Sequence, residues 1–165
     1  LANETNIEIV IIRPPLVYGP NVGGNFLSLM SLIYRGFPIP LKASNNLRSL
    51  ISLQNLCSFI ILCIKHPNAK NQIFFISDDE DLSVKNLIKR IALSMNKSLR
   101  LIYIPIAILK LLGFLLFKKK LINRLTDSLQ VSTQKAKNLL EWTPIMRCEE
   151  AIELTVNHYL KSKKK

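Results

Sequence analysis

A short apolar run that ends at a pair of prolines constrains this chain more than any other feature. Residues 9–12, Ile-Val-Ile-Ile, are followed directly by Arg13-Pro14-Pro15-Leu16-Val17-Tyr18-Gly19-Pro20. An apolar, β-branched run bounded by turn residues predicts a buried strand, here over residues 7–12. Because each proline removes a backbone donor and fixes φ, we expect the chain to leave the sheet at the prolines and to turn at Gly19-Pro20.

This stiff exit loop has two interpretations. In open α/β sheets, ligands bind in the crevice outside the carboxyl ends of the strands, so the loop is a candidate ligand-facing element. The alternative is a plain connection from strand to helix, because glycine and proline commonly punctuate such connections. The local sequence by itself favours the plain connection.

Strands and helices are predicted to alternate along the rest of the chain. Beyond the first strand, extended segments are predicted over residues 37–41, 48–53, 72–76 and 101–104, and two prolines exclude a central strand at 37–41. Helices are predicted to begin at Asn25, near Asn55 as a cap, at Ser83, at Ser132-Thr133 and at Glu149, the last with Ala151, Ile152, Leu154 and Val156 inward. The alternation predicts an α/β fold whose last third is mostly helical.

The net charge of +12 raises the question of an anionic partner. Nucleic acid, an anionic membrane and an acidic substrate are all compatible with such a charge. The lysines are scattered, however, apart from residues 118–120 and the tail at 161–165. A charge run is usually a solvated face, so we interpret most of the charge as surface and expect no nucleic-acid partner.

The most apolar stretch, residues 105–117, ends at the basic run 118–120. It is interrupted by Lys110 and is shorter than the roughly 20 residues that a transmembrane helix needs. We expect a helix that packs on a partner or makes a weak membrane-surface contact through residues 105–120.

Three cysteines bear on the compartment of the protein. They form no C-x-x-C pair, and Cys57 and Cys63 lie in an apolar helical stretch, which predicts small core residues. An odd number of cysteines without a signal peptide favours a reducing cytosol. The expected location is therefore cytoplasmic, or peripheral to a membrane if residues 105–120 make that contact.

The segment Arg13-Pro14-Pro15-Leu16-Val17-Tyr18-Gly19-Pro20, followed by Asn25-Phe26-Leu27, resembles a known family. It looks like the second half of the extended short-chain dehydrogenase/reductases, the NAD-dependent epimerase/dehydratases that act on nucleotide sugars. Within them, the chain most resembles the UDP-sugar 4-epimerases and 4-reductases of surface-polysaccharide synthesis. The resemblance covers almost the whole chain. It implies that residues 1–165 are the C-terminal portion of an extended Rossmann-type NAD(P)-binding fold, with a mostly helical substrate-binding subdomain.

The resemblance also implies roles for single residues. Arg48 and Asn25 match an arginine and an asparagine that lie near the diphosphate of the nucleotide sugar. These roles suit a guanidinium, which binds phosphate through two hydrogen bonds, and a helix N-terminus, which attracts anions. The local alternatives are a surface arginine at a strand edge and a simple N-cap.

Three further segments match the family, the last of them loosely. Pro14, Pro15 and Leu16 lie where the family loop passes the nicotinamide ring and the sugar, although Leu16 replaces a polar residue that touches the sugar in many epimerases. Residues Pro38, Ile39, Pro40 and Leu41 resemble the segment whose backbone pairs with uracil, the alternative being a hydrophobic loop. Arg124 lies where a second phosphate-binding arginine is often found, and an ordinary exposed helix end is the alternative that we favour.

Two motifs of the family are absent from the sequence. Dinucleotide binding needs a glycine-rich turn between a strand and a helix, and family catalysis uses a tyrosine with a lysine four positions on. The glycine-rich turn is not present among the five glycines. Of the four tyrosines, only Tyr159 has a lysine at this spacing, Lys163, and because the pair lies in the basic tail and not in a core helix we do not interpret it as the family motif. The resemblance therefore implies that NAD, or NADP, is bound mainly by an N-terminal half missing from this chain, which also carries the catalytic pair.

Two remaining motifs are interpreted as structural. Leu139-Leu140-Glu141-Trp142-Thr143-Pro144 resembles the family ending Leu-Gly-Trp-x-Pro, with Glu141 in place of the glycine. The acidic run of residues 78–81 lacks the spacing of a calcium loop, so we predict an acidic turn.

Three hypotheses for the function remain open. The first is a substrate-binding part of an epimerase/dehydratase, inactive alone, that meets a UDP-sugar and an N-terminal Rossmann partner chain or a second copy of itself. The second is a basic, non-enzymatic module that binds a membrane surface or a partner. The third is an inactive fragment of a split reading frame.

Overall fold

The computed structural model of the chain describes residues 7–41, 46–99, 101–103 and 128–163. The predicted apolar helix at 105–117, the basic run 118–120 and Arg124 lie outside the described residues. The structure therefore leaves the expected membrane contact and the second phosphate-binding arginine as predictions.

Short strands alternate with helices along the described chain, which confirms the predicted α/β class. The strands are β1 (Ile11–Arg13), β2 (Leu16–Tyr18), β3 (Ile39–Leu41), β4 (Leu47–Ser52), β5 (Ile73–Phe75), β6 (Asp81–Ser83) and β7 (Leu101–Tyr103). The helices are α1 (Gly24–Tyr34), α2 (Leu53–Lys65), the 3₁₀ helix η1 (Pro67–Ala69), α3 (Val84–Ser94), α6 (Gln134–Leu140) and α7 (Cys148–Lys163).

The two prolines separate two short strands that belong to different sheets. Before them, β1 pairs in parallel with β5, and after them β2 pairs in parallel with β4. The expectation that the chain leaves its sheet at the prolines is therefore confirmed, because β1 ends at Arg13 and β2 belongs to a different sheet. Pro14 and Pro15 occupy the gap between two pairings, where a missing N–H group breaks no ladder. The predicted turn at Gly19 is confirmed by a hydrogen bond from the Val22 N–H to the Gly19 oxygen, 3.0 Å.

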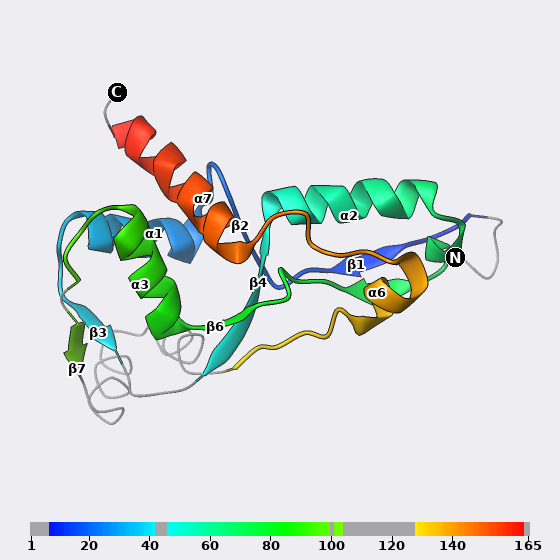
Figure 1. The fold of residues 1–165 in the computed structure, drawn as a ribbon, viewed down its shortest axis with the longest axis horizontal. Coiled ribbons are helices and arrows are strands. Elements are labelled where there is room, and N and C mark those ends of the chain that lie inside the picture. The colour runs from blue at the N-terminus through cyan, green and yellow to red at the C-terminus, as the bar shows by residue number, and fades with distance from the viewer. Residues whose placement is uncertain (1–6, 42–45, 100, 104–127, 164–165) are drawn as a thin grey trace.

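Strand β4 separates two hydrophobic clusters. Successive residues of a strand face opposite sides, and on β4 the neighbours Leu50 and Ile51 enter different clusters. One cluster is built mainly by α1, α3 and α7, and the other by α2, α6 and β5. Figure 1 shows this arrangement, with α1, α3 and α7 gathered on one side of β4 and with α2 and α6 on opposite sides of β1 on the other.

Helix caps differ from the sequence expectation at two positions. Ser52, and not Asn55, caps α2, because its side chain accepts the N–H of Asn55. Helix α1 begins after Gly23, so Asn25 lies inside the helix and the N-cap alternative for it is wrong. Ser83 is confirmed as the cap of α3 through a bond from the Asn86 N–H. The correct cap is in each case one turn or less from the expected residue, a distance at which sequence patterns do not discriminate.

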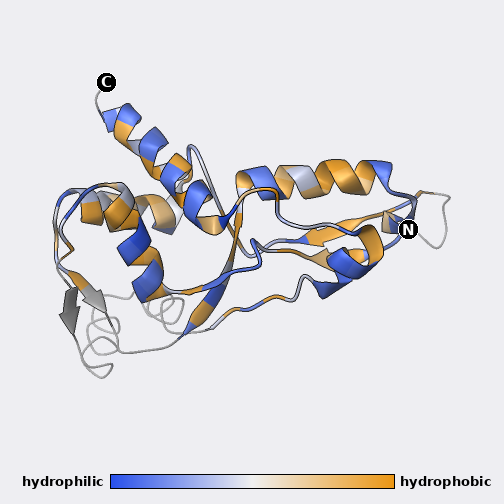
Figure 2. Cartoon of the chain, in the orientation of Figure 1, coloured by the Kyte–Doolittle hydropathy of each residue, from blue (hydrophilic) through white to orange (hydrophobic). Residues whose placement is uncertain are grey.

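Two predictions about buried side chains need correction. Leu154 of α7 is 39% exposed, whereas Thr155 is buried and takes the inward position. In α2, Cys63 is buried as expected but Cys57 is exposed. Both helices are covered on one face only, and Figure 2 shows the resulting mixture of hydrophilic and hydrophobic residues along them.

Candidate functional site

The pairing of β2 with β4 brings the exit loop close to the candidate phosphate-binding arginine. Leu16 pairs with Leu50, so Arg48 lies on the neighbouring strand, two residues before the partner of Leu16. Arg48 is half-buried and stands opposite Leu82 of β6 on its other side. Pro14 and Leu16 are exposed at the same end of the pairing. The structure therefore places these two parts of the predicted site on adjacent strands.

Asn25 is joined through an aromatic contact to the opposite end of the β2–β4 pairing, where Tyr18 pairs with Ser52. It is exposed and is the second residue of α1, and Phe26 beside it stacks on Tyr18 at the end of β2. The two ring centres are 5.5 Å apart with an angle of 14° between the ring planes. The first turn of α1, where a helix presents unbonded N–H groups, is thus held against the end of β2.

The predicted base-binding segment is extended, as expected. Ile39–Leu41 forms β3 and pairs in parallel with β7. Pro38 is exposed, and Ile39, 6% exposed, belongs to the cluster of α1, α3 and α7. Figure 1 shows the pair β3 and β7 at the end of the molecule beyond α1 and α3, away from β1 and β5. Because β7 is the single described partner of β3, Pro40 lies on an edge strand, where a missing N–H is tolerated.

One residue of the predicted acidic turn at 78–81, Asp78, is buried. Asp78 is 5% exposed, and its carboxylate accepts hydrogen bonds from the Tyr18 hydroxyl at 2.7 Å, the Ser52 N–H at 2.9 Å and the Asn55 side-chain amide at 2.7 Å. A buried carboxylate is stable only with such partners. The signal in the sequence was an aspartate placed just after a strongly apolar strand, and sequence reasoning missed it.

The other three carboxylates of the run each bind a different element. Asp79 pairs with Lys137 of α6 and accepts the Thr133 hydroxyl. Glu80 pairs with Arg90 of α3, and Asp81 accepts the Ser49 hydroxyl of β4 at 2.5 Å. The run therefore connects helices and strands from both sides of β4.

Tyr18 and Cys148 both stay protonated at neutral pH. The Tyr18 hydroxyl lies 3.4 Å from the Cys148 sulfur. Burial raises the pKa of Tyr18 well above its ordinary range, and the negative charge of Asp78 raises it further. Burial likewise raises the pKa of Cys148 to about 11. Tyr18 is therefore a hydrogen-bond donor in a structural network, which agrees with the sequence argument that it is not the catalytic tyrosine of the family.

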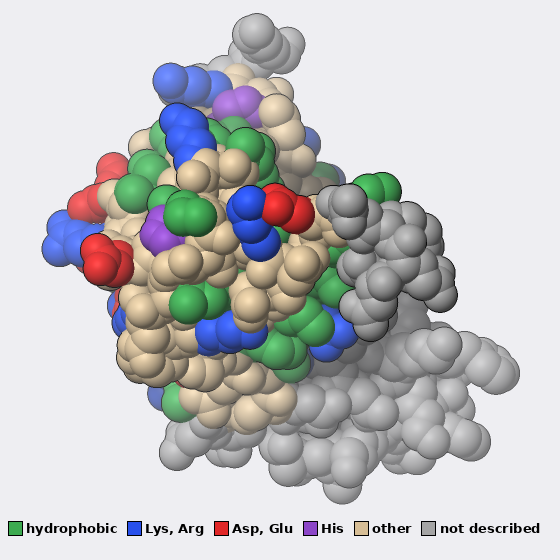
Figure 3. Space-filling model, turned by 90° about the vertical axis from the view of Figure 1, so that its right-hand side faces the viewer, with side chains coloured by type: hydrophobic (Ala, Val, Ile, Leu, Met, Phe, Trp, Pro, Cys, Tyr) green, Lys and Arg blue, Asp and Glu red, His purple; other side chains and the backbone are tan. Residues whose placement is uncertain are grey.

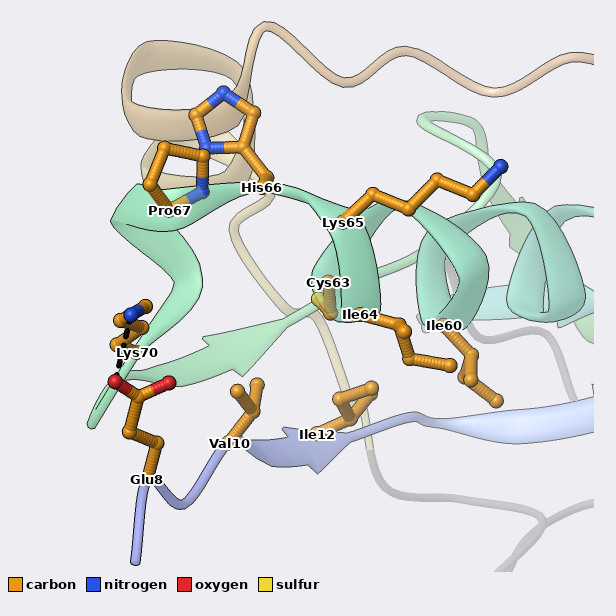
Figure 4. A pocket seen from close by; sticks show the side chains of 10 residues that line it. All are labelled: Glu8, Val10, Ile12, Ile60, Cys63, Ile64, Lys65, His66, Pro67 and Lys70. Carbon is orange, nitrogen blue, oxygen red and sulfur yellow. Dashed lines mark hydrogen bonds and ion pairs between the residues drawn. The ribbon is translucent and has the colours of Figure 1, made fainter. Parts of the chain in front are cut away.

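A groove of about 610 Å³ lies between β1 and α2, apart from the residues above. In Figure 4, apolar side chains from β1 and from α2 point toward each other, and the Lys70–Glu8 ion pair closes one end. Figure 3 views the molecule from this end and shows hydrophobic side chains interspersed with charged ones. The residues that line the groove are Glu8, Val10, Ile12, Ile60, Cys63, Ile64, Lys65, His66, Pro67 and Lys70.

The described part of the chain contains neither a metal site nor a membrane-spanning helix. Within it, no group of histidine, cysteine, aspartate or glutamate side chains has the arrangement of a metal site. No helix in residues 7–41, 46–99, 101–103 and 128–163 is long and apolar enough to span a bilayer.

Comparison with known proteins identifies the relatives of the chain. No family model matches it. It is 39% identical over 163 residues to UDP-glucose 4-epimerase of Vibrio cholerae, a match that covers 98% of this chain and 50% of the relative. Its homologues are UDP-glucose 4-epimerase and related NAD-dependent epimerase/dehydratases. A weaker match, 27% identical over 101 residues, is to N-acetyl-alpha-D-glucosaminyl-diphospho-ditrans,octacis-undecaprenol 4-epimerase of Escherichia coli O157:H7, and covers 61% of this chain and 30% of that protein.

Solved structures show the same fold. The UDP-glucose 4-epimerase of Thermotoga maritima, solved with UDP-glucose, superposes with a TM-score of 0.74 at 20% identity and covers 98% of this chain and 49% of that one. The enzyme WbmG of Bordetella bronchiseptica, solved with NAD and UDP, gives 0.71 at 12% identity, over 96% of this chain and 46% of that one. The chain thus matches the C-terminal half of Rossmann-type epimerase structures, as the resemblance predicted, and spans about half the length of its curated relatives.

Proposed function

We propose that this chain is the nucleotide-sugar-binding part of an NAD-dependent epimerase or dehydratase that acts on a UDP-sugar, in the synthesis of a surface polysaccharide. The observation that carries the proposal is the 39% identity to a UDP-glucose 4-epimerase across 98% of the chain. The fold supports it, because the pairing of β2 with β4 places Arg48 beside the exit loop that the resemblance assigns to the site.

Within this proposal, the diphosphate is bound from two sides. Arg48 offers a planar guanidinium that forms two parallel bonds to phosphate oxygens. Asn25 lies in the first turn of the 11-residue helix α1, whose N–H groups and dipole favour an anion. Residues 38–41 would pair with the base through their backbone, and Arg124 would add a second cation.

The proposal assigns most of the cofactor-binding site to the part of the enzyme outside this chain. Among the described glycines, Gly19, Gly23 and Gly24 follow β2 but do not form the Gly-x-x-Gly-x-x-Gly turn that lets a backbone approach a pyrophosphate. These residues therefore do not fit a complete dinucleotide site. The proposal assigns only the loop of Pro14, Pro15 and Leu16 to the nicotinamide side of the crevice, and NAD or NADP mainly to the missing half.

The groove between β1 and α2 is the surface that the proposal assigns to that other half. Exposed apolar side chains of α2 line it, with Ile60 39% and Ile64 79% exposed. An apolar patch beside an exposed strand typically marks a protein interface. The occupant would be an N-terminal half-chain, in cis or as a separate partner, or a second copy of this chain.

Calorimetric titration with UDP-glucose tests the proposal. The purified chain, shown to be folded by circular dichroism, is expected to bind saturably, and Arg48→Gln is expected to weaken binding about tenfold or more because a charge-assisted phosphate contact is lost. Arg147→Gln is the matched control, since Arg147 is exposed and pairs only locally with Glu150. A folded chain without saturable binding, or equal losses in the two variants, contradicts the proposal.

A further inference from the structure

A single buried carboxylate joins the elements that build the candidate site. Both oxygens of Asp78 accept hydrogen bonds, Oδ2 from the Tyr18 hydroxyl at 2.7 Å and Oδ1 from the Asn55 amide at 2.7 Å. The Ser52 N–H reaches both oxygens, at 2.9 Å and 3.1 Å. Because Ser52 caps the 13-residue helix α2, the carboxylate lies at the positive end of a helix dipole.

Tyr18 links the Asp78 carboxylate to the first turn of α1. Its side chain is 1% exposed, its hydroxyl binds Asp78, and its ring stacks on Phe26. Phe26 is the neighbour of Asn25, the candidate diphosphate ligand. The orientation of one phenol ring therefore fixes the start of α1 relative to the end of β4.

Two further contacts involve the first turn of α2. One holds the loop between β2 and α1 against it, and the other holds the residues just before α7. A Cβ atom added to Gly19 would lie 2.9 Å from the Leu53 Cβ, so the loop passes in close contact with the first residue of α2. Asn55 donates to the Met146 oxygen at 2.9 Å and accepts the Met146 N–H at 3.0 Å. The network thus lies where the two hydrophobic clusters meet, at the carboxyl end of β4.

We propose that Asp78 is a positioning residue for the nucleotide-sugar site: acting through Tyr18, it holds the loop of residues 19–23 and the first turn of α1 in the geometry that binds the diphosphate. This inference rests on the proposed function. The physical reason is preorganisation, because a loop that is already ordered loses less conformational freedom when the ligand binds. Asp78 acts on the ligand only through Tyr18 and α1.

Tyr18→Phe is the informative variant. It removes the hydroxyl that binds Asp78 and keeps the ring that stacks on Phe26. Thr155→Val is the matched control, because Thr155 is also buried and its hydroxyl donates to the Ala151 oxygen at 2.7 Å within α7, away from the network. Both variants lose one buried hydroxyl, but only the first touches the network.

Two measurements are made on wild type and both variants. The affinity for UDP-glucose is expected to fall about tenfold in Tyr18→Phe and to stay unchanged in Thr155→Val. Amide hydrogen exchange is expected to speed up at residues 19–28 in Tyr18→Phe only, because the hydroxyl bond no longer restrains that loop. Uniformly faster exchange across the molecule, or equal effects in the two variants, overturns the inference. The bond between Tyr18 and Asp78 would then stabilise the fold without positioning the site.

The two proposals fail separately. A wild-type chain that does not bind UDP-glucose contradicts the proposed function, whereas the exchange pattern at residues 19–28 still decides whether Asp78 restrains the loop. A double variant, Tyr18→Phe with Asp78→Asn, adds a thermodynamic cycle. Affinity losses that simply add would show that the two residues act independently, which also overturns the inference.

Discussion

At the scale of the residue, Glu141 occupies a backbone conformation that favours glycine. It ends α6 with φ of 53° and ψ of 24°, in the left-handed region. This is the position at which the Leu-Gly-Trp-x-Pro ending has glycine, and the substitution noticed in the sequence therefore has a cost. A side chain in this region costs roughly 1–2 kcal/mol compared with the ordinary helical region.

Glu141→Gly is expected to raise the free energy of unfolding by about 1 kcal/mol, because glycine adopts the left-handed conformation without a Cβ clash. Urea denaturation measures the change. Glu153→Gly, in the middle of α7, is the control and is expected to lower the free energy of unfolding by about 1 kcal/mol. An unchanged or lower stability of Glu141→Gly would show that the glutamate side chain compensates for the strain.

The buried thiol of Cys148 makes stability depend on alkaline pH. Its pKa is raised from 9.0 to about 11 by burial, so between these values the unfolded chain loses the proton and the folded chain keeps it. Deprotonation then favours unfolding, and the free energy of unfolding is expected to fall as the pH rises from 9 to 11, by on the order of 2 kcal/mol. The raised pKa of Tyr18 acts in the same direction.

Urea denaturation at a series of pH values checks this. Cys148→Ala is expected to flatten the decline between pH 9 and 11, whereas Cys57→Ala, at an exposed position, leaves the decline as in wild type. A slope that is the same in the Cys148→Ala variant contradicts the assignment of this thiol.

At the scale of the element, the start of α2 shows that a sequence does not distinguish a helix cap from a residue that makes tertiary hydrogen bonds. Ser52 and Asn55 are both good cap residues three positions apart. In the structure Ser52 caps the helix, while Asn55 binds Asp78 and both backbone groups of Met146.

The two roles predict different losses of stability. Ser52→Ala is expected to lower the free energy of unfolding by about 1 kcal/mol, the usual loss for a cap. Asn55→Ala is expected to cost about 3 kcal/mol, because it removes one donor from the buried Asp78 carboxylate and the side-chain partner of both Met146 backbone groups. Thermal and urea unfolding of the two variants compares them, and a smaller loss for Asn55→Ala than for Ser52→Ala would restore Asn55 as the cap.

The short strands illustrate which elements the sequence predicts well. The apolar runs at 72–76 and 48–53 indicated β5 and β4 within a residue or two, because buried strands need apolar side chains whatever their neighbours are. The run at 7–12 became a strand of three residues, Ile11–Arg13, because the ladder with β5 extends only that far. Strand length depends on a partner, and a partner distant in the chain leaves no mark in the local pattern.

At the scale of the whole molecule, the groove between β1 and α2 is an exposed apolar surface on a chain half as long as its relatives. We expect the chain alone to self-associate as its concentration rises, because such a surface lowers its free energy when it is covered. Ile64→Glu is expected to weaken this association. Leu93→Glu is the matched control, since Leu93 of α3 is 78% exposed, close to the 79% of Ile64, and does not line the groove.

Sedimentation velocity at several concentrations measures the association. A strictly monomeric wild-type chain contradicts the expectation. Equal effects of the two substitutions would show that general surface hydrophobicity, and not the groove, drives the association.

The amino-acid sequence by itself determined the α/β class, most of the helices and the family resemblance, because these follow from local apolar patterns and from a motif of consecutive residues such as Arg13 to Pro20. Only the tertiary structure decided that the two prolines mark a change of strand partner, that Ser52 and not Asn55 caps α2, and that Asp78 is buried. Its three hydrogen-bond partners are 23 to 60 residues away along the chain. The physical reason is that an aspartate has the same local pattern on a surface turn as in a buried network, and only the groups that fold against it supply the hydrogen bonds that make burial favourable.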